Sequence, residues 1–154
     1  TDFDLSECTL LDADEFGARW ACAGYKGYPV WIAEGDLRFF VSYGFYAPEQ
    51  PAAGQTPGPF NTLGPRIEWR MTDEDGNWRP IATIVRYLTE PPDYRGEMLV
   101  VTRLGPEGVC QVAWIDARAN PDANELAREA ADTLAPDFDC AQQPVIWGMR
   151  GQSF

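Results

Sequence analysis

The chain has 154 residues and a formal charge of −12, because 24 acidic side chains outnumber 12 basic ones. This balance excludes the basic patch that nucleic-acid binding requires, so no nucleic-acid partner is expected. A hydrophobic fraction of 45% and an aromatic fraction of 13% indicate a globular protein. We expect a single domain over residues 1–154, since a chain of this length buries about 68–70% of its unfolded surface.

Four cysteines and the absence of histidine limit the chemistry of the chain. Cys8, Cys22, Cys110 and Cys140 form no CxxC motif, so we expect no metal site and no cofactor. Three disulfide connectivities are possible, and we favour Cys8–Cys22 with Cys110–Cys140 because each closes a local loop. Disulfides persist in oxidising compartments, which predicts a disulfide-stabilised periplasmic or secreted protein. The alternative is four buried free thiols in a cytosolic protein.

Residues 22–46 hold the densest run of aromatic and β-branched residues and predict a central hairpin. An apolar run at residues 29–33 and an alternating run at residues 37–45 give its two strands, joined by a turn at residues 34–36. The N-terminal segment, residues 1–11, is expected to be loose without its disulfide, and it is followed by a polar turn at residues 12–17 and a short strand at residues 18–22. No run of 18 apolar residues exists, so no transmembrane segment is expected.

Residues 47–65 form a Pro/Gly-rich segment with five prolines and three glycines and with neither helical nor strand periodicity. Loops of this length inside compact domains are uncommon, and they are often lids or binding loops. The alternative is a passive connection between two regions of the sheet. The segment is therefore a candidate functional loop.

The following residues predict two more hairpins. Residues 66–72 alternate between polar and apolar side chains, and residues 81–89 are apolar on both faces, as in an interior strand. Asp75-Gly76 lies at the centre of the turn between them. Residues 98–104 and 109–115 form the next pair of strands, joined by a turn that contains two glycines.

One helix is predicted near the C-terminus. Asn120 is a suitable N-cap, Pro121 is a suitable first helical residue, and Leu126, Ala130 and Leu134 fall on one face. We therefore predict an α+β fold: an antiparallel sheet of about six or seven strands built from hairpins, with the helix of residues 121–134 packed on one face. A last short strand or a packed segment follows at residues 145–147.

The absence of histidine removes the Ser-His, Cys-His and His-metal arrangements of most hydrolases. Carboxylates remain for acid–base chemistry, and Glu34, Asp36 and Glu68 are the candidates for a paired-carboxylate site that acts on glycans. Carboxylates also lie close together by chance in a chain this acidic. Surface charges beside a turn are the simpler interpretation of Glu34 and Asp36.

Candidate binding residues lie on and around the central hairpin. Tyr25, Lys26 and Tyr28 place the only lysine of the chain between two tyrosines on a loop next to a disulfide cysteine, where aromatic side chains make good contact anchors. The alternative is a connecting turn whose tyrosines cover the core. Arg38 is a candidate cation for an anionic group; the alternative is a residue on the solvent-exposed face of its strand, or one paired with a nearby Asp or Glu. Phe60 adds an aromatic contact from the Pro/Gly-rich segment.

We therefore expect a non-catalytic, exported protein that binds another macromolecule, as an accessory factor or inhibitor in the cell envelope. Its partner would be a protein or another envelope component, and the contact would involve residues 25–29 and 47–65. A carboxylate-dependent glycan-acting enzyme is the first alternative. A carrier of a small ligand is the second, and it requires that the sheet closes into a barrel.

Overall fold

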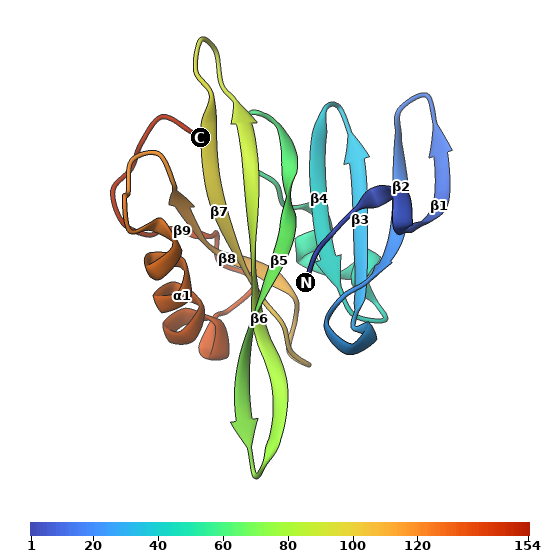
Figure 1. Cartoon of the computed structure of the whole chain (residues 1–154), viewed down its shortest axis with the longest axis vertical. Coiled ribbons are helices and arrows are strands. Elements are labelled where there is room, and N and C mark those ends of the chain that lie inside the picture. The colour runs from blue at the N-terminus through green and yellow to red at the C-terminus, as the bar shows by residue number, and fades with distance from the viewer.

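The computed structural model describes all 154 residues and contains two β-sheets and one α-helix (Figure 1). The first sheet has four antiparallel strands in sequence order: β1 (Thr9–Asp14), β2 (Gly17–Ala23), β3 (Pro29–Gly35) and β4 (Arg38–Tyr43). The second sheet has five strands in sequence order: β5 (Phe60–Glu74), β6 (Asn77–Glu90), β7 (Gly96–Arg103), β8 (Cys110–Asp116) and β9 (Val145–Ile146). Only β9 is parallel to its neighbour, β8.

The protein has three layers, with the five-stranded sheet between the four-stranded sheet and α1 (Ala123–Leu134) (Figure 1). Successive side chains of a strand point to opposite faces, so Ile84 packs toward α1 while Val85 packs toward the first sheet. Val101 and Val100 divide in the same way on β7. The middle sheet is therefore buried on both faces, as the apolar pattern of residues 81–89 indicated.

The α+β class is confirmed, whereas the single sheet of six or seven strands is wrong because β4 and β5 do not pair side by side. Side chains occupy the backbone groups of Phe39, at the start of β4, that a neighbouring strand would use. The Asn61 side-chain carbonyl accepts from Phe39 N at 2.9 Å, and Thr56 Oγ1 donates to Phe39 O at 2.7 Å. The free edge of the first sheet is thus closed beside β4, and a new sheet begins at β5.

The helix begins two residues later than the sequence predicts and ends at the predicted Leu134. Asp122 is the N-cap residue, because the Asn120 side chain bonds elsewhere: its amide donates to Asp116 O and Met149 O, both at 2.9 Å. The buried face of α1 consists of four alanines, Ala123, Ala127, Ala130 and Ala131. Small side chains let the helix lie close against β6, β7 and β8.

Several turns and strand ends differ from the sequence prediction. The central hairpin turns at Asp36-Leu37, both with positive φ (52° and 60°), because Gly35 pairs with Arg38 inside the ladder. The N-terminal segment is a hairpin: the Asp14 carboxylate accepts from two backbone N–H groups after it and holds a two-residue turn between β1 and β2. Strands β5 and β6 extend to the Asp75-Gly76 turn, well beyond residues 66–72 and 81–89.

Both favoured disulfides are present, Cys8–Cys22 and Cys110–Cys140, with sequence separations of 14 and 30 residues. The first joins the segment before β1 to the end of β2, and the second joins β8 to the segment after α1. The single α-helix has 12 residues and is neither long nor apolar enough to cross a membrane.

Candidate functional site: the aromatic end

Trp69 on β5 packs against three tyrosines of the first sheet and its loops. Its ring centroid lies 5.5 Å from that of Tyr28, 5.8 Å from that of Tyr43 and 6.5 Å from that of Tyr25. These tilted and edge-on contacts each stabilise by about 0.5–1.5 kcal/mol beyond the area they bury. The loop between β2 and β3 is thereby fastened to the second sheet.

This loop is a compact turn whose backbone is fixed by its own hydrogen bonds. Gly24 N donates to Tyr28 O at 2.8 Å, and Tyr28 N donates to Tyr25 O at 2.9 Å. Gly24 has no room for a side chain, because a Cβ there would overlap with the Trp69 indole. Lys26 is exposed in a left-handed conformation (φ 48°), which is uncommon for a residue with a Cβ. The loop therefore presents its lysine to solvent on a rigid base.

Phe45 and Tyr46 lie next to this loop and are largely exposed, at 90% and 70%. They follow Gly44, whose positive φ (94°) turns the chain away from β4 and whose N–H donates to Pro29 O at 3.0 Å. The alternation of residues 37–45 predicted Phe45 inside a strand, and neither Phe45 nor Tyr46 was a candidate binding residue. The glycine was the available signal, since Gly44 ends the strand where the alternation still continues.

We call the surface formed by Tyr25, Lys26, Tyr28, Phe45 and Tyr46 the aromatic end. It combines two loops that are adjacent because Gly44 is hydrogen-bonded to Pro29. Phe45 and Tyr46 are its exposed aromatic side chains, whereas Tyr25 and Tyr28 are half-buried beside Trp69. Neighbouring exposed aromatic side chains often mark interaction surfaces on soluble proteins.

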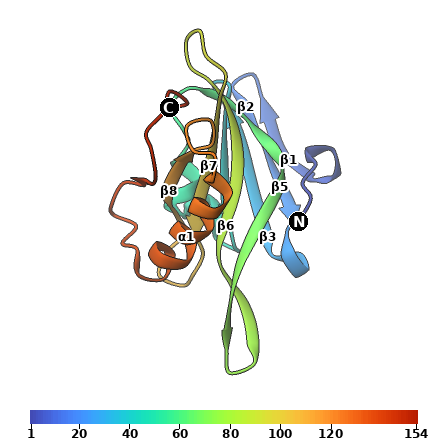
Figure 2. The ribbon, with the colours of Figure 1, turned by 60° about the vertical axis from the view of Figure 1, so that its left-hand side comes forward.

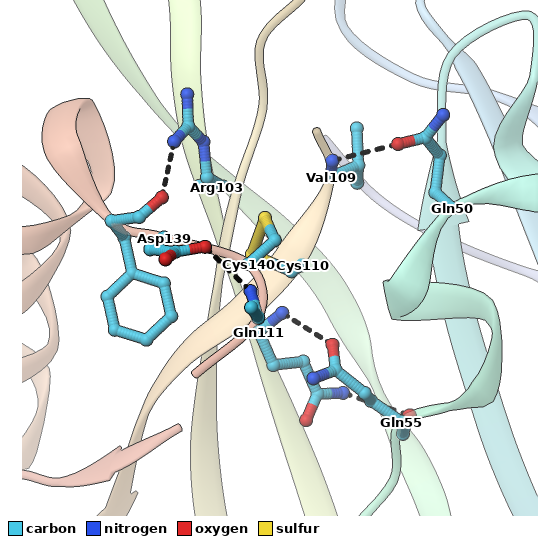
Figure 3. Close-up of a disulfide and its surroundings, with 10 residues drawn as sticks. Gln50, Gln55, Arg103, Val109, Cys110, Gln111, Asp139 and Cys140 are labelled. Atoms are coloured by element: carbon cyan, nitrogen blue, oxygen red, sulfur yellow. Dashed lines mark hydrogen bonds between the residues drawn. A yellow bond between two sulfur atoms is a disulfide. The ribbon is translucent and has the colours of Figure 1, made fainter. Parts of the chain in front are cut away.

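The chain that follows Tyr46 is fixed to β8 and to the residue before it (Figure 3). Val109 N donates to the Gln50 side chain at 3.0 Å, and Gln111 N donates to the Gln55 side chain at 2.7 Å. Between them, Ala52 is fully buried and its N–H donates to Val109 O at 3.0 Å. Residues 47–54 form two short 3-10 helices, η3 (Ala47–Glu49) and η4 (Pro51–Gly54), and residues 60–65 belong to β5. The first half of the Pro/Gly-rich segment is an anchored connection.

Arg38 lies at the opposite end of the first sheet from the aromatic end, because Arg38 pairs with Gly35 whereas Tyr43 pairs with Val30, and Phe60 of β5 lies beside Arg38. The Arg38 guanidinium lies 5.1 Å from the Phe60 ring centroid and donates to Gly58 O at 2.7 Å and to the Asp36 carboxylate at 2.7 Å. Together with prolines and Phe154 they line an open hollow of about 580 Å³. The five candidate binding residues therefore divide into two separate groups.

The three candidate acid–base carboxylates do not form one site. Glu68 lies on β5 and is held by the Arg128 guanidinium of α1 at 2.8 and 2.9 Å, an interaction that lowers the pKa of Glu68. Glu34 accepts from Leu37 N at 3.2 Å, and Asp36 forms the ion pair with Arg38 at the tip of the other sheet. Each carboxylate thus has its own structural partner, that of Glu68 on the helix and those of the other two within the turn of the central hairpin.

A second feature projects from the same end of the molecule as the aromatic end. Beyond Pro80, β5 and β6 continue as a two-stranded ribbon that extends past both sheets (Figure 2). We call residues 71–80 the finger. Residues 73–79 are all exposed, and Trp78 is 65% exposed. The sequence predicted only a turn here, because nothing in the local pattern shows how far a hairpin extends beyond its sheet.

No protein-family model matches the chain, and no curated protein or solved structure gives a match. Function therefore rests on the geometry of the sites in this structure. The two sheets also remain open and do not close into a barrel, and the space between them is filled by side chains such as Ile32, Val41, Tyr87 and Val100. The condition for a ligand carrier with an interior cavity is not met.

Proposed function

We propose that this is an exported, non-catalytic protein that binds another protein through the aromatic end, as an accessory factor or an inhibitor. The observation that carries the proposal is the exposure of Phe45 and Tyr46 beside the loop that bears Tyr25, Lys26 and Tyr28. Leaving two neighbouring aromatic side chains in water forgoes about 1.5–3 kcal/mol of burial for each. A partner that covers them recovers this free energy.

Rigid support makes this surface suitable for binding. Trp69 and backbone hydrogen bonds fix the loop of residues 24–28, and η3 and η4 follow directly after Tyr46. Aromatic side chains on a fixed backbone lose little conformational entropy when a partner covers them. Among the other exposed apolar side chains, Leu10, Leu11 and Phe16 belong to the β1–β2 hairpin and lie among acidic residues.

Export is supported by the two disulfides, which are stable in oxidising compartments. A non-catalytic role is supported by the residue chemistry. The chain has no histidine, and the carboxylates Glu34, Asp36 and Glu68 are separated and engaged in structural contacts.

The test is affinity capture from the periplasmic or secreted fraction of the source cells with three immobilised chains. These are the wild type, Phe45→Ser/Tyr46→Ser, and the matched control Leu10→Ser/Leu11→Ser, which removes two apolar side chains that are 55% and 54% exposed on β1. The proposal expects one protein that the wild type and the control retain and the Phe45/Tyr46 variant loses.

Two results would contradict the proposal. Either no protein is retained specifically by the wild type, or the retained protein binds equally well to the Phe45/Tyr46 variant. Both substituted pairs are exposed, so circular dichroism of the variants is expected to match the wild type and to exclude misfolding as the cause of any loss.

A further inference from the structure

The finger has a base and a tip with different surroundings. Its base is marked by Pro80, which pairs with Met71 at an irregularity in the β5–β6 ladder. Strand β7 pairs with β6 only from Ala82 onward, so the finger has no third strand. Asp75 and Gly76 both have positive φ (53° and 83°), the conformation of the tight hairpin turn that matches the twist of two strands. The finger is thus a defined two-stranded projection.

The finger makes no contribution to the core. Residues 73–79 are exposed on both faces of the ribbon, and the tip extends about 10 Å beyond the Met71–Pro80 pair at about 3.4 Å per residue. A two-stranded ribbon alone in water is only marginally stable. A projection of this length that carries an exposed tryptophan has a shape that fits a concave surface.

The two faces of the finger differ in charge. On one face, Arg79 and Glu74 form an ion pair at 2.6 Å, so that face is neutral by itself. On the other face, Trp78 is directly opposite Asp73 in the ladder, so the indole and this carboxylate lie side by side. Asp73 forms no ion pair, and neither does Asp75 in the turn.

This pairing specifies the chemistry of the surface that receives the finger. A pocket that buries Trp78 also desolvates the neighbouring Asp73 carboxylate, which is costly unless a cation pairs with it. The pocket must therefore combine an apolar wall for the indole with lysine or arginine side chains at its rim. The net charge of −12 on the chain favours the approach to such a basic surface.

We infer that the finger inserts into a basic cleft of the protein partner, with Trp78 as the anchor and Asp73 paired to a lysine or arginine at its rim. This inference rests on the proposed function, because the finger projects from the same end as the aromatic end and would meet the same partner (Figure 2). The aromatic end would then contact the surface around the cleft. A finger that fills a cleft also blocks it, which favours an inhibitor over a passive accessory factor.

Site-specific photo-crosslinking to the partner captured above, once purified, tests the inference. The photoreactive residue p-benzoylphenylalanine replaces Trp78 in one chain and Phe16, which is 78% exposed on the β1–β2 turn, in the control chain. We expect cross-links from position 78 to partner peptides that line a cleft and include lysine or arginine, and none from position 16. Cross-links from position 78 to a flat or acidic surface would overturn the inference.

Affinity measurements with matched variants separate the anchor from general charge effects. Trp78→Ala should weaken binding at least about tenfold, because it removes a tryptophan anchor that the partner buries. Asp73→Lys should weaken binding by a similar factor, because the new lysine is repelled by the basic rim of the cleft. Glu74→Gln/Arg79→Gln, which removes the ion pair of the opposite face without changing the net charge, is expected to change the affinity by less than about twofold.

The outcomes also distinguish this inference from the proposed function. If Phe45→Ser/Tyr46→Ser abolishes binding while Trp78→Ala and Asp73→Lys bind like the wild type, the finger is not inserted and the proposed function remains. If no partner is captured by the wild type at all, the proposed function and this inference both fail.

Discussion

Two tryptophans on the same hairpin occupy very different surroundings. Trp69 lies at the base of the β5–β6 hairpin, where its ring contacts Tyr25, Tyr28 and Tyr43. Trp78 lies on the finger and is 65% exposed. The comparison shows that an aromatic residue on this hairpin is structural where another sheet covers it, and available for binding where the ribbon has left both sheets.

The base of the β5–β6 hairpin, around Trp69, also lies near both disulfides and the hydrogen bonds of the Pro/Gly-rich segment. Cys22 lies near the end of β2, just before the loop that packs on Trp69, and Cys110 lies between Val109 and Gln111, which hold Gln50 and Gln55 (Figure 3). The finger has neither a disulfide nor a third strand. Substitutions at the base are therefore expected to change the free energy of unfolding, and substitutions on the finger are not.

Removal of the disulfide Cys110–Cys140 is expected to have the largest effect. The bridge closes a segment with a sequence separation of 30 residues. By the chain-entropy relation, Cys110→Ala/Cys140→Ala lowers the free energy of unfolding by about 3.6 kcal/mol, against about 3 kcal/mol for Cys8→Ala/Cys22→Ala with its shorter loop. Urea denaturation of both double variants measures the two losses. A larger loss for the Cys8/Cys22 pair would contradict this order.

Trp69→Ala is expected to destabilise the protein by about 3 kcal/mol, at the lower end for tryptophan truncation because the side chain is only partly buried. The tyrosines of the loop lose their packing partner, so near-ultraviolet circular dichroism should weaken as well. Trp69→Phe is the matched control and is expected to retain most of the stability. An unfolding free energy of Trp69→Ala equal to that of the wild type would break the distinction between base and finger.

The buried Tyr87 is expected to make the protein less stable at alkaline pH. It is buried in the core between the sheets, and burial, with a further contribution from Tyr43, raises the pKa of its hydroxyl. Since the pKa is higher in the folded chain, the stabilisation is fully present below the unfolded value of about 10 and falls as pH rises above it, by at most about 1.4 kcal/mol per pH unit.

Urea midpoints between pH 9 and pH 11.5 test this prediction. Tyr87→Phe is expected to flatten the alkaline decline, whereas Tyr46→Phe, on the exposed aromatic end, is expected to leave it unchanged. At pH 7 the Tyr87→Phe substitution should cost little, because the buried hydroxyl has no hydrogen-bond partner. Identical declines in the wild type and Tyr87→Phe would show that this hydroxyl is not responsible.

The features that the sequence predicted correctly depend on short-range patterns. The hairpin of β7 and β8, the end of α1 at Leu134 and both cysteine pairings follow from local alternation, helical spacing and loop closure. The division into two sheets depends instead on Thr56 and Asn61, whose side chains reach across to Phe39. No local pattern reports such a contact between distant segments.

Only part of the candidate site could be predicted, again because the sequence shows local patterns and not contacts between distant segments. Tyr25, Lys26 and Tyr28 could be selected because a lysine between tyrosines is visible in the sequence. Phe45 and Tyr46 were missed because the alternation of β4 continues to Phe45, and the one sequence signal was Gly44, where the backbone turns and exposes both side chains. Arg38 and Phe60 do contact each other, but the fold places them at the other end of the sheet.

Trp78→Ala is expected to have the smallest effect on the free energy of unfolding, less than about 0.5 kcal/mol, because an exposed side chain on a two-stranded ribbon makes few packing contacts. The matched comparison is Trp69→Ala, which removes the same side chain nine residues earlier. Urea denaturation of the two variants, side by side, gives the difference directly.

If Trp78→Ala destabilised the fold as much as Trp69→Ala, the finger would be a structural element, and the exposed tryptophan would no longer indicate a binding partner. If Trp78→Ala leaves the free energy of unfolding unchanged but lowers the affinity for the partner, Trp78 contributes to binding and not to folding.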